Sequence, residues 1–105
     1  MTLTKQEIAE IVKTLLEKYH ADYAILFGSY ARGDATEDSD IDLIVFGGEH
    51  FKSMNIFAFG EDLRQLTQKK VDAFEIREVN TDTEFYRNVL SEGVRIARKS
   101  LIRNA

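Results

Sequence analysis

Residues 28–46 read GSYARGDATEDSDIDLIVF and end in an apolar run typical of a buried strand. Asp40 and Asp42 stand inside the strand predicted over 40–46, where an ionised carboxylate loses hydration and needs a partner. Side chains alternate along a strand, so both aspartates point to one face, with Cα atoms roughly 6.5 Å apart. Because two carboxylates on one face repel each other unless a cation lies between them, we infer a site for a hard divalent cation such as Mg²⁺.

The start of the same stretch is suited to binding a phosphate. A strand predicted over 23–27 runs into Gly28 and Ser29, and a short helix or turn begins there. Gly28 has no side chain to keep an anion away from the backbone, and Ser29 adds a hydroxyl. Arg32 offers a planar fork of donors for phosphate oxygens. Since Mg²⁺ commonly completes its shell with water and substrate phosphate, the two ends of the stretch predict one site.

A third carboxylate is predicted to complete this site. VDAFEI at 71–76 indicates another strand, and Asp72 lies near its start. If that strand pairs beside the strand at 40–46, Asp72 shares the face of the other two aspartates. There it would hold a second metal ion and take a proton from an attacking hydroxyl. The competing interpretation is an ordinary strand-end aspartate near Lys69 or Lys70.

The other segments indicate an α+β fold. A first helix begins at the capping box Thr4–Glu7, and a second helix is predicted over 53–68. Thr81–Glu84 has capping-box spacing and predicts a third helix. Residues 94–105 fit a short edge strand, a helix or a frayed tail. We therefore expect a small mixed or antiparallel sheet covered by helices on one face.

Composition narrows the class of protein. A chain of 105 residues, 44% hydrophobic and 30% charged, predicts one domain over 1–105 with a tail that is loose from about residue 98. It lacks cysteine, which excludes disulfides, thiolate metal sites and cysteine nucleophiles. A net charge of −4 argues against an extended nucleic-acid surface. No apolar run approaches a membrane span and no signal peptide is evident, so we expect a cytoplasmic protein without membrane contact.

Two other motifs match parts of the acidic stretch. The ligand spacing of an EF-hand calcium loop fits four acidic positions, but the sixth position of that loop needs glycine and is Leu43 here. The D-x-D of nucleotide-sugar transferases matches residues 40–42 but leaves the Gly28-Ser29 pair unexplained. Neither motif accounts for the whole stretch.

GSYARGDATEDSDIDLIV resembles the G-S-x-x-x-G…S-D-x-D signature of the DNA polymerase beta type nucleotidyltransferase superfamily. Within it, the chain looks most like the minimal nucleotidyltransferases, the short antitoxin partners of HEPN-domain proteins. The dense part of the motif covers residues 22–46, and a weaker agreement through Asp72 extends over most of the chain. The resemblance implies a polymerase-beta-like fold with two functional groups of residues: nucleotide-binding Gly28, Ser29, Arg32 and Ser39, and the catalytic, metal-binding acids Asp40, Asp42 and Asp72.

The resemblance also implies an activity. It is the transfer of AMP from ATP, with two Mg²⁺ ions, to a tyrosine hydroxyl of a HEPN-type toxin, which silences the toxin within a hetero-oligomer. The alternative is a non-catalytic antitoxin that neutralises its partner by direct contact. The intact set of Asp40, Asp42 and Asp72 weakens this alternative, because a module freed from catalysis need not keep three clustered acids.

Overall fold

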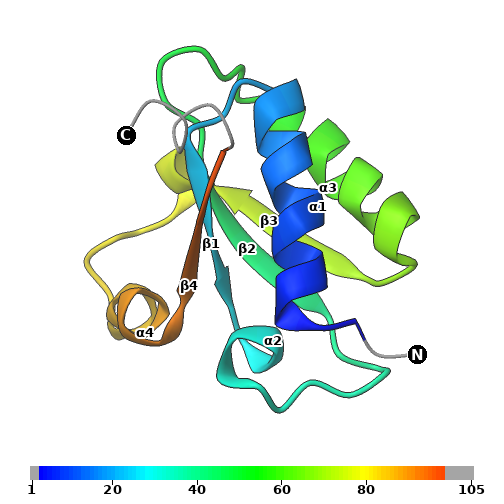
Figure 1. Cartoon of the computed structure of the whole chain (residues 1–105). Helices are drawn as coiled ribbons and strands as arrows, with labels where there is room; N and C mark the ends of the chain where they lie inside the picture. The colour runs from blue at the N-terminus through cyan, green and yellow to red at the C-terminus, as the bar shows by residue number, and fades with distance from the viewer. Residues whose placement is uncertain (1–2, 99–105) are drawn as a thin grey trace.

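The computed structural model describes residues 3–98 and shows four strands in one mixed sheet with helices packed on it (Figure 1). The sheet order is β3-β2-β1-β4; β1 runs antiparallel to both β2 and β4, and β2 runs parallel to β3. The predicted α+β fold class is confirmed. In chain order the elements are α1 (Lys5–Lys18), β1 (Tyr23–Phe27), α2 (Ser29–Arg32), β2 (Ile41–Phe46), α3 (Asn55–Thr67), β3 (Val71–Glu75), the 3₁₀ turn η1 (Ile76–Glu78), α4 (Glu84–Glu92) and β4 (Val94–Ala97).

The main core lies between the sheet and the helices α1 and α3, which pack side by side on one face (Figure 1). Ile41, Leu43 and Val45 of β2 are fully buried in this core. Because side chains alternate along a strand, Asp42 points to the opposite face, as the sequence predicts. The apolar stripe of α1 and the apolar positions of β2 thus fix which face of the sheet carries the acid.

The helix α4 departs from the predicted one-sided cover, because it packs against the other face of the sheet. Its Val89 contributes to a second, smaller cluster with Ile25 of β1 and Ile44 of β2. Ala24, Ile25 and Leu26 of β1 are all buried. Because side chains alternate along a strand, β1 presents apolar side chains on both faces of the sheet, and both faces must be covered. The prediction of helices on one face therefore holds for α1 and α3 and is wrong for α4.

Helix boundaries follow local capping. The box at the start of α1 is present as predicted: Glu7 N–H donates to Thr4 Oγ1 at 3.0 Å, and Thr4 N–H donates to Glu7 Oε1 at 2.8 Å. The box predicted at Thr81–Glu84 is wrong by two residues, because Thr83 is the N-cap of α4 and accepts from Tyr86 N–H at 3.1 Å. Asp40 lies just before β2 rather than inside it.

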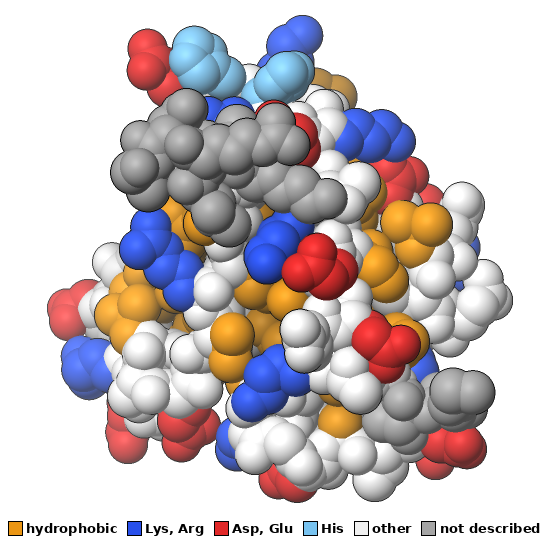
Figure 2. Space-filling model, in the orientation of Figure 1, with side chains coloured by type: hydrophobic (Ala, Val, Ile, Leu, Met, Phe, Trp, Pro, Cys, Tyr) orange, Lys and Arg blue, Asp and Glu red, His pale blue; other side chains and the backbone are white. Residues whose placement is uncertain are grey.

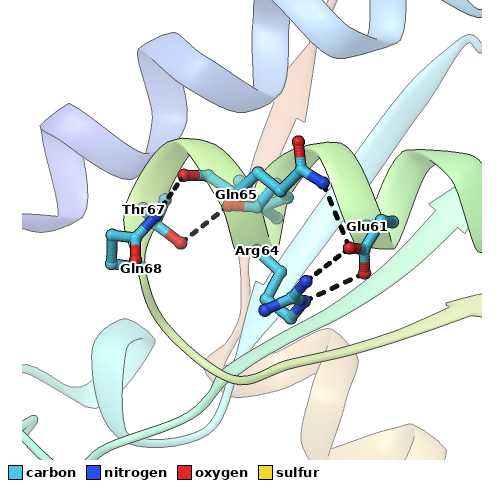
Figure 3. Close-up of polar contacts among 6 residues, drawn as sticks. Glu61, Arg64, Gln65, Thr67 and Gln68 are labelled. Carbon is cyan, nitrogen blue, oxygen red and sulfur yellow. Dashed lines mark hydrogen bonds and ion pairs between the residues drawn. The ribbon is translucent and has the colours of Figure 1, made fainter.

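The outer side of α3 is polar near its end (Figure 3). Arg64 Nε donates to Glu61 Oε2 at 2.9 Å, and Gln65 Nε2 donates to the same carboxylate at 3.2 Å. Gln68 ends the helix in a left-handed conformation, with its side chain donating to the Gln65 carbonyl at 2.8 Å. The bond from Gln68 satisfies one of the carbonyl groups that the last turn of a helix leaves without a backbone partner.

The C-terminal segment resolves one of the alternatives left by the sequence. Val94–Ala97 forms the edge strand β4 and pairs antiparallel with β1, with Ala97 opposite Tyr23. The predicted loose tail lies almost wholly outside the described residues, which end at position 98. Within residues 3–98, no helix has the length and apolar character needed to cross a membrane. On the face in Figure 2, acidic and basic side chains are interspersed.

Candidate active site

Strand pairing brings two of the predicted acids together. Asp42 of β2 lies opposite Asp72 of β3 in the parallel register, and opposite Phe27, the last residue of β1, in the antiparallel register. Residues opposite each other on neighbouring strands point to the same face of the sheet. The predicted pairing of the strand at 71–76 beside the strand at 40–46 is therefore found, and it places Asp72 beside Asp42.

The carboxylates act on one another electrostatically. Burial, followed by the negative charges of Asp72 and then Asp40, raises the pKa of Asp42 to about 6 from an ordinary value of 3.8. The guanidinium of Arg32 acts in the opposite direction and lowers it. An acid whose ionised form is disfavoured by two other acids is stabilised by any cation that binds among them. The electrostatic repulsion among the three aspartates therefore favours binding of a cation between them.

Gly28 connects the predicted phosphate-binding element to these acids. Its backbone has φ +76° and ψ −152°, a region that only glycine occupies readily. A Cβ added at Gly28 would lie 2.5 Å from Oδ2 of Asp42, closer than such atoms approach. The missing side chain is therefore required for the end of β1 to lie directly against the carboxylate. Ser29 then begins α2, whose first amide groups have no partner inside the helix.

An open cleft of about 500 Å³ contains most of the predicted site residues. This volume lies within the range of small-molecule sites. The end of β1, α2, and the two acids Asp40 and Asp42 each contribute to its lining. A further wall comes from α4. The residues that line it are Phe27, Gly28, Ser29, Arg32, Asp40, Asp42, Phe85, Asn88, Val89 and Glu92.

Two predicted site residues lie beside this cleft rather than on its wall. Asp72 is exposed and is placed next to the cleft by its register with Asp42. Ser39 holds the loop before β2, because its Oγ accepts from Thr36 N–H at 2.8 Å. In this structure Ser39 therefore positions the backbone that leads into Asp40, and its contact with a nucleotide stays a prediction.

The donor set suits Mg²⁺ supported by a phosphate ligand. Within residues 3–98, no three acidic or histidine side chains converge closely enough to hold a metal ion on their own. Protein sites for Mg²⁺ commonly use one or two carboxylates and leave the other positions to water and substrate phosphates. Asp40 and Asp42 in the same cleft as Gly28 and Ser29 supply this incomplete kind of site.

The wall formed by α4 was not predicted from the sequence as part of the site. Phe85 and Val89 fit the apolar pattern of that helix, and Asn88 and Glu92 look like ordinary exposed polar residues. Their contribution depends on α4 crossing to the face of the sheet that carries Asp42. Among the lining residues that were not predicted, Phe27 is the one that the sequence could have indicated, because it directly precedes Gly28.

Comparisons with known proteins agree with this geometry. The family model for polymerase beta nucleotidyltransferases matches residues 9–101. A Methanocaldococcus jannaschii protein named as a candidate protein adenylyltransferase is 35% identical over 97 residues, which cover 85% of this chain and 93% of that protein. The protein adenylyltransferase MntA of Thermococcus cleftensis is 36% identical over 74 residues, covering 67% of this chain and 75% of MntA.

The fold also occurs in a solved complex of a tri-AMPylated HEPN toxin from Shewanella oneidensis with an MNT antitoxin. The matching chain superposes with a TM-score of 0.67 at 18% identity, and the match covers 96% of this chain and 78% of that one.

Proposed function

Because this chain belongs to the polymerase beta nucleotidyltransferase family, we propose that it transfers AMP from ATP to a tyrosine hydroxyl of a HEPN-type toxin and thereby acts as an antitoxin. The names of its relatives support adenylyl transfer to a protein. The solved complex of similar fold supports a HEPN toxin as acceptor. The observation that carries the proposal is the close approach of Gly28 to Asp42 in a cleft that also contains Ser29 and Asp40.

The triphosphate is bound at the end of β1. The Gly28 backbone can lie against a phosphate because no side chain intervenes, and the first amides of α2, which have no partner inside the helix, are available to donate to it. The Ser29 hydroxyl adds one donor. Arg32, which is half exposed and makes a long contact from Nε to Asp34 Oδ2 of 3.4 Å, can turn to the phosphate oxygens.

Asp40, Asp42 and Asp72 would hold two Mg²⁺ ions together with the phosphate oxygens of ATP. When bound, Mg²⁺ neutralises charge that develops on the transferred phosphoryl group and on pyrophosphate. Asp72, exposed beside Asp42, accepts the proton of the attacking hydroxyl. The acceptor oxygen forms a bond to the α-phosphorus, the bond from that phosphorus to the bridging oxygen breaks, and pyrophosphate leaves.

Position-specific labelling tests this proposal. The purified chain is incubated with Mg²⁺, the protein encoded beside it, and ATP labelled at either the α- or the γ-phosphate. We expect label on the neighbouring protein from α-labelled ATP alone. Asp40→Asn and Asp42→Asn should abolish labelling, and Asp72→Asn should slow it by about 100-fold or more.

Glu10→Gln is the matched control, because Glu10 is an exposed acid on α1. This variant should label its target at the wild-type rate. Transfer of the γ-label would instead identify a kinase. A wild-type rate in Asp40→Asn or Asp42→Asn would contradict the assignment of the acids.

A further inference from the structure

We propose that α4 forms the nucleobase subsite of the cleft, in which Phe85 stacks on the adenine ring and Asn88 binds its edge. The proposal rests on the proposed function, because it requires the triphosphate of ATP to lie at Gly28 and Ser29. It adds a role for the wall of the cleft that α4 contributes.

The aromatic part of this wall adjoins the phosphate site. Phe27 directly precedes Gly28, and its ring lies edge-on to Phe85, with ring centroids 5.6 Å apart and planes at 83°. Phe85 remains 52% exposed although it lines the cleft. A ring with a free surface beside a phosphate site can stack on a base, a contact that proteins use with any base because each has a π-face. Phe85 is therefore placed to hold the base end of the nucleotide.

The polar part of the wall can distinguish one base from another. Asn88 and Glu92 follow Phe85 at i+3 and i+7, so the three side chains lie on one side of α4 and all line the cleft. An asparagine amide has both a donor and an acceptor, which match N7 and N6 of adenine. Within residues 3–98, neither the Asn88 amide nor the Glu92 carboxylate has a hydrogen-bond or ion-pair partner.

Charge fixes the direction of the nucleotide in the cleft. Glu92 repels phosphate at the α4 wall and can accept a hydrogen bond from an exocyclic amine, whereas Arg32 lies with Gly28 and Ser29. The base therefore belongs at α4 and the phosphates at α2. The ring of an acceptor tyrosine fits this wall less well, because its only polar group is the hydroxyl that must reach the acids, and the Asn88 amide would have no match.

Binding of two ligands that have only the triphosphate part in common distinguishes the contribution of this subsite from that of the phosphate site. Calorimetric titration in Mg²⁺ compares α,β-methylene-ATP with tripolyphosphate. We expect Phe85→Ala to weaken binding of α,β-methylene-ATP by about tenfold or more, the loss of one base stack, and to leave tripolyphosphate binding unchanged. Leu90→Ala is the matched control on the same helix, since Leu90 is 54% exposed and lies outside the cleft.

Asn88→Asp tests recognition of the base edge. Aspartate cannot donate to N7 of adenine but can accept from the N–H groups of guanine. We expect the preference for the adenine over the guanine nucleotide to fall by about tenfold or more, again with tripolyphosphate binding unchanged.

The possible outcomes are distinct. Equal losses for both ligands in Phe85→Ala, or no loss for either, would overturn the nucleobase subsite. Unchanged nucleotide affinity with slower modification of the partner protein would assign the wall to the acceptor instead. A wild-type chain that binds neither ligand would overturn the proposed function, and the subsite with it.

Discussion

Gly28 and Asp42 form the contact on which the proposed site depends at the scale of single residues. In Gly28→Ala the new methyl would meet the Asp42 carboxylate and force the backbone from a region reserved for glycine. We expect a loss of about 1–3 kcal/mol in unfolding free energy, together with loss of tripolyphosphate binding in Mg²⁺. Urea unfolding and calorimetry measure the two effects.

Gly33→Ala is the matched control for this variant. Gly33 also has a positive φ, +87°, but its conformation is ordinary left-handed, and an added Cβ would meet nothing within 4 Å. We expect a cost of about 1 kcal/mol with phosphate binding preserved. Equal binding by both alanine variants would contradict the role of the Gly28–Asp42 contact.

Asp42 makes the metal-free protein sensitive to pH. Its pKa is raised to about 6 in the folded state, above an ordinary value of 3.8, so its ionised form costs stability. That cost is absent below about pH 4, grows as the pH rises toward 6 and is complete above it. Asp42→Asn should therefore raise the melting temperature in EDTA at pH 7.5 and have little effect at pH 3.5.

Thermal unfolding followed by circular dichroism measures this difference. Asp82→Asn is the control, because the Asp82 side chain is fully exposed on the loop before α4. Its effect on the melting temperature should not follow the same pH course. A stabilisation by Asp42→Asn that is equally large at both pH values would contradict repulsion among the acids.

Single residues also show how much of the site the sequence predicts. The alternation of Asp40 to Phe46 correctly predicts which face carries Asp42, because burial of Ile41, Leu43 and Val45 decides it. The position of Ser39 could not be predicted in the same way. Its hydroxyl can either bind a ligand or hold the loop, and only the local fold shows that it accepts from Thr36.

At the scale of elements, α4 provides a direct test through its N-cap. Thr83 accepts a hydrogen bond from Tyr86 N–H, whereas Thr81 lies outside the helix. Thr83→Ala should lower the unfolding free energy by about 1 kcal/mol, and Thr81→Ala should leave it unchanged. Urea unfolding measures both values. The reverse order would place the start of α4 at the capping box that the sequence suggested.

The same helix marks the limit of prediction from sequence at this scale. Capping signals and apolar spacing show that a helix follows β3, but they do not show which face of the sheet it covers. That depends on the buried surface presented by Ile25 and Ile44, which Val89 covers. The residues that α4 adds to the cleft therefore became evident only in the folded structure.

The sheet as a whole assembles a site from segments far apart in the sequence. β2 pairs with β1 on one side and β3 on the other, and this arrangement places Asp42 opposite both Phe27 and Asp72. Local pattern predicts the strands but not their order or register, which result from long-range packing. The sequence predicts the chemistry through the motif at residues 28–46 and Asp72. The topology places Asp72 beside Asp42 and adds the wall from α4.

The intact mass of the protein encoded beside this chain tests the central claim most directly. The pair is co-expressed with the wild-type chain and with Asp40→Asn/Asp42→Asn, and the neighbouring protein is weighed by mass spectrometry. We predict one or more added AMP groups with the wild type and none with the double variant. An unmodified neighbour that co-purifies equally with both would contradict transfer, and would identify an antitoxin that acts by direct contact.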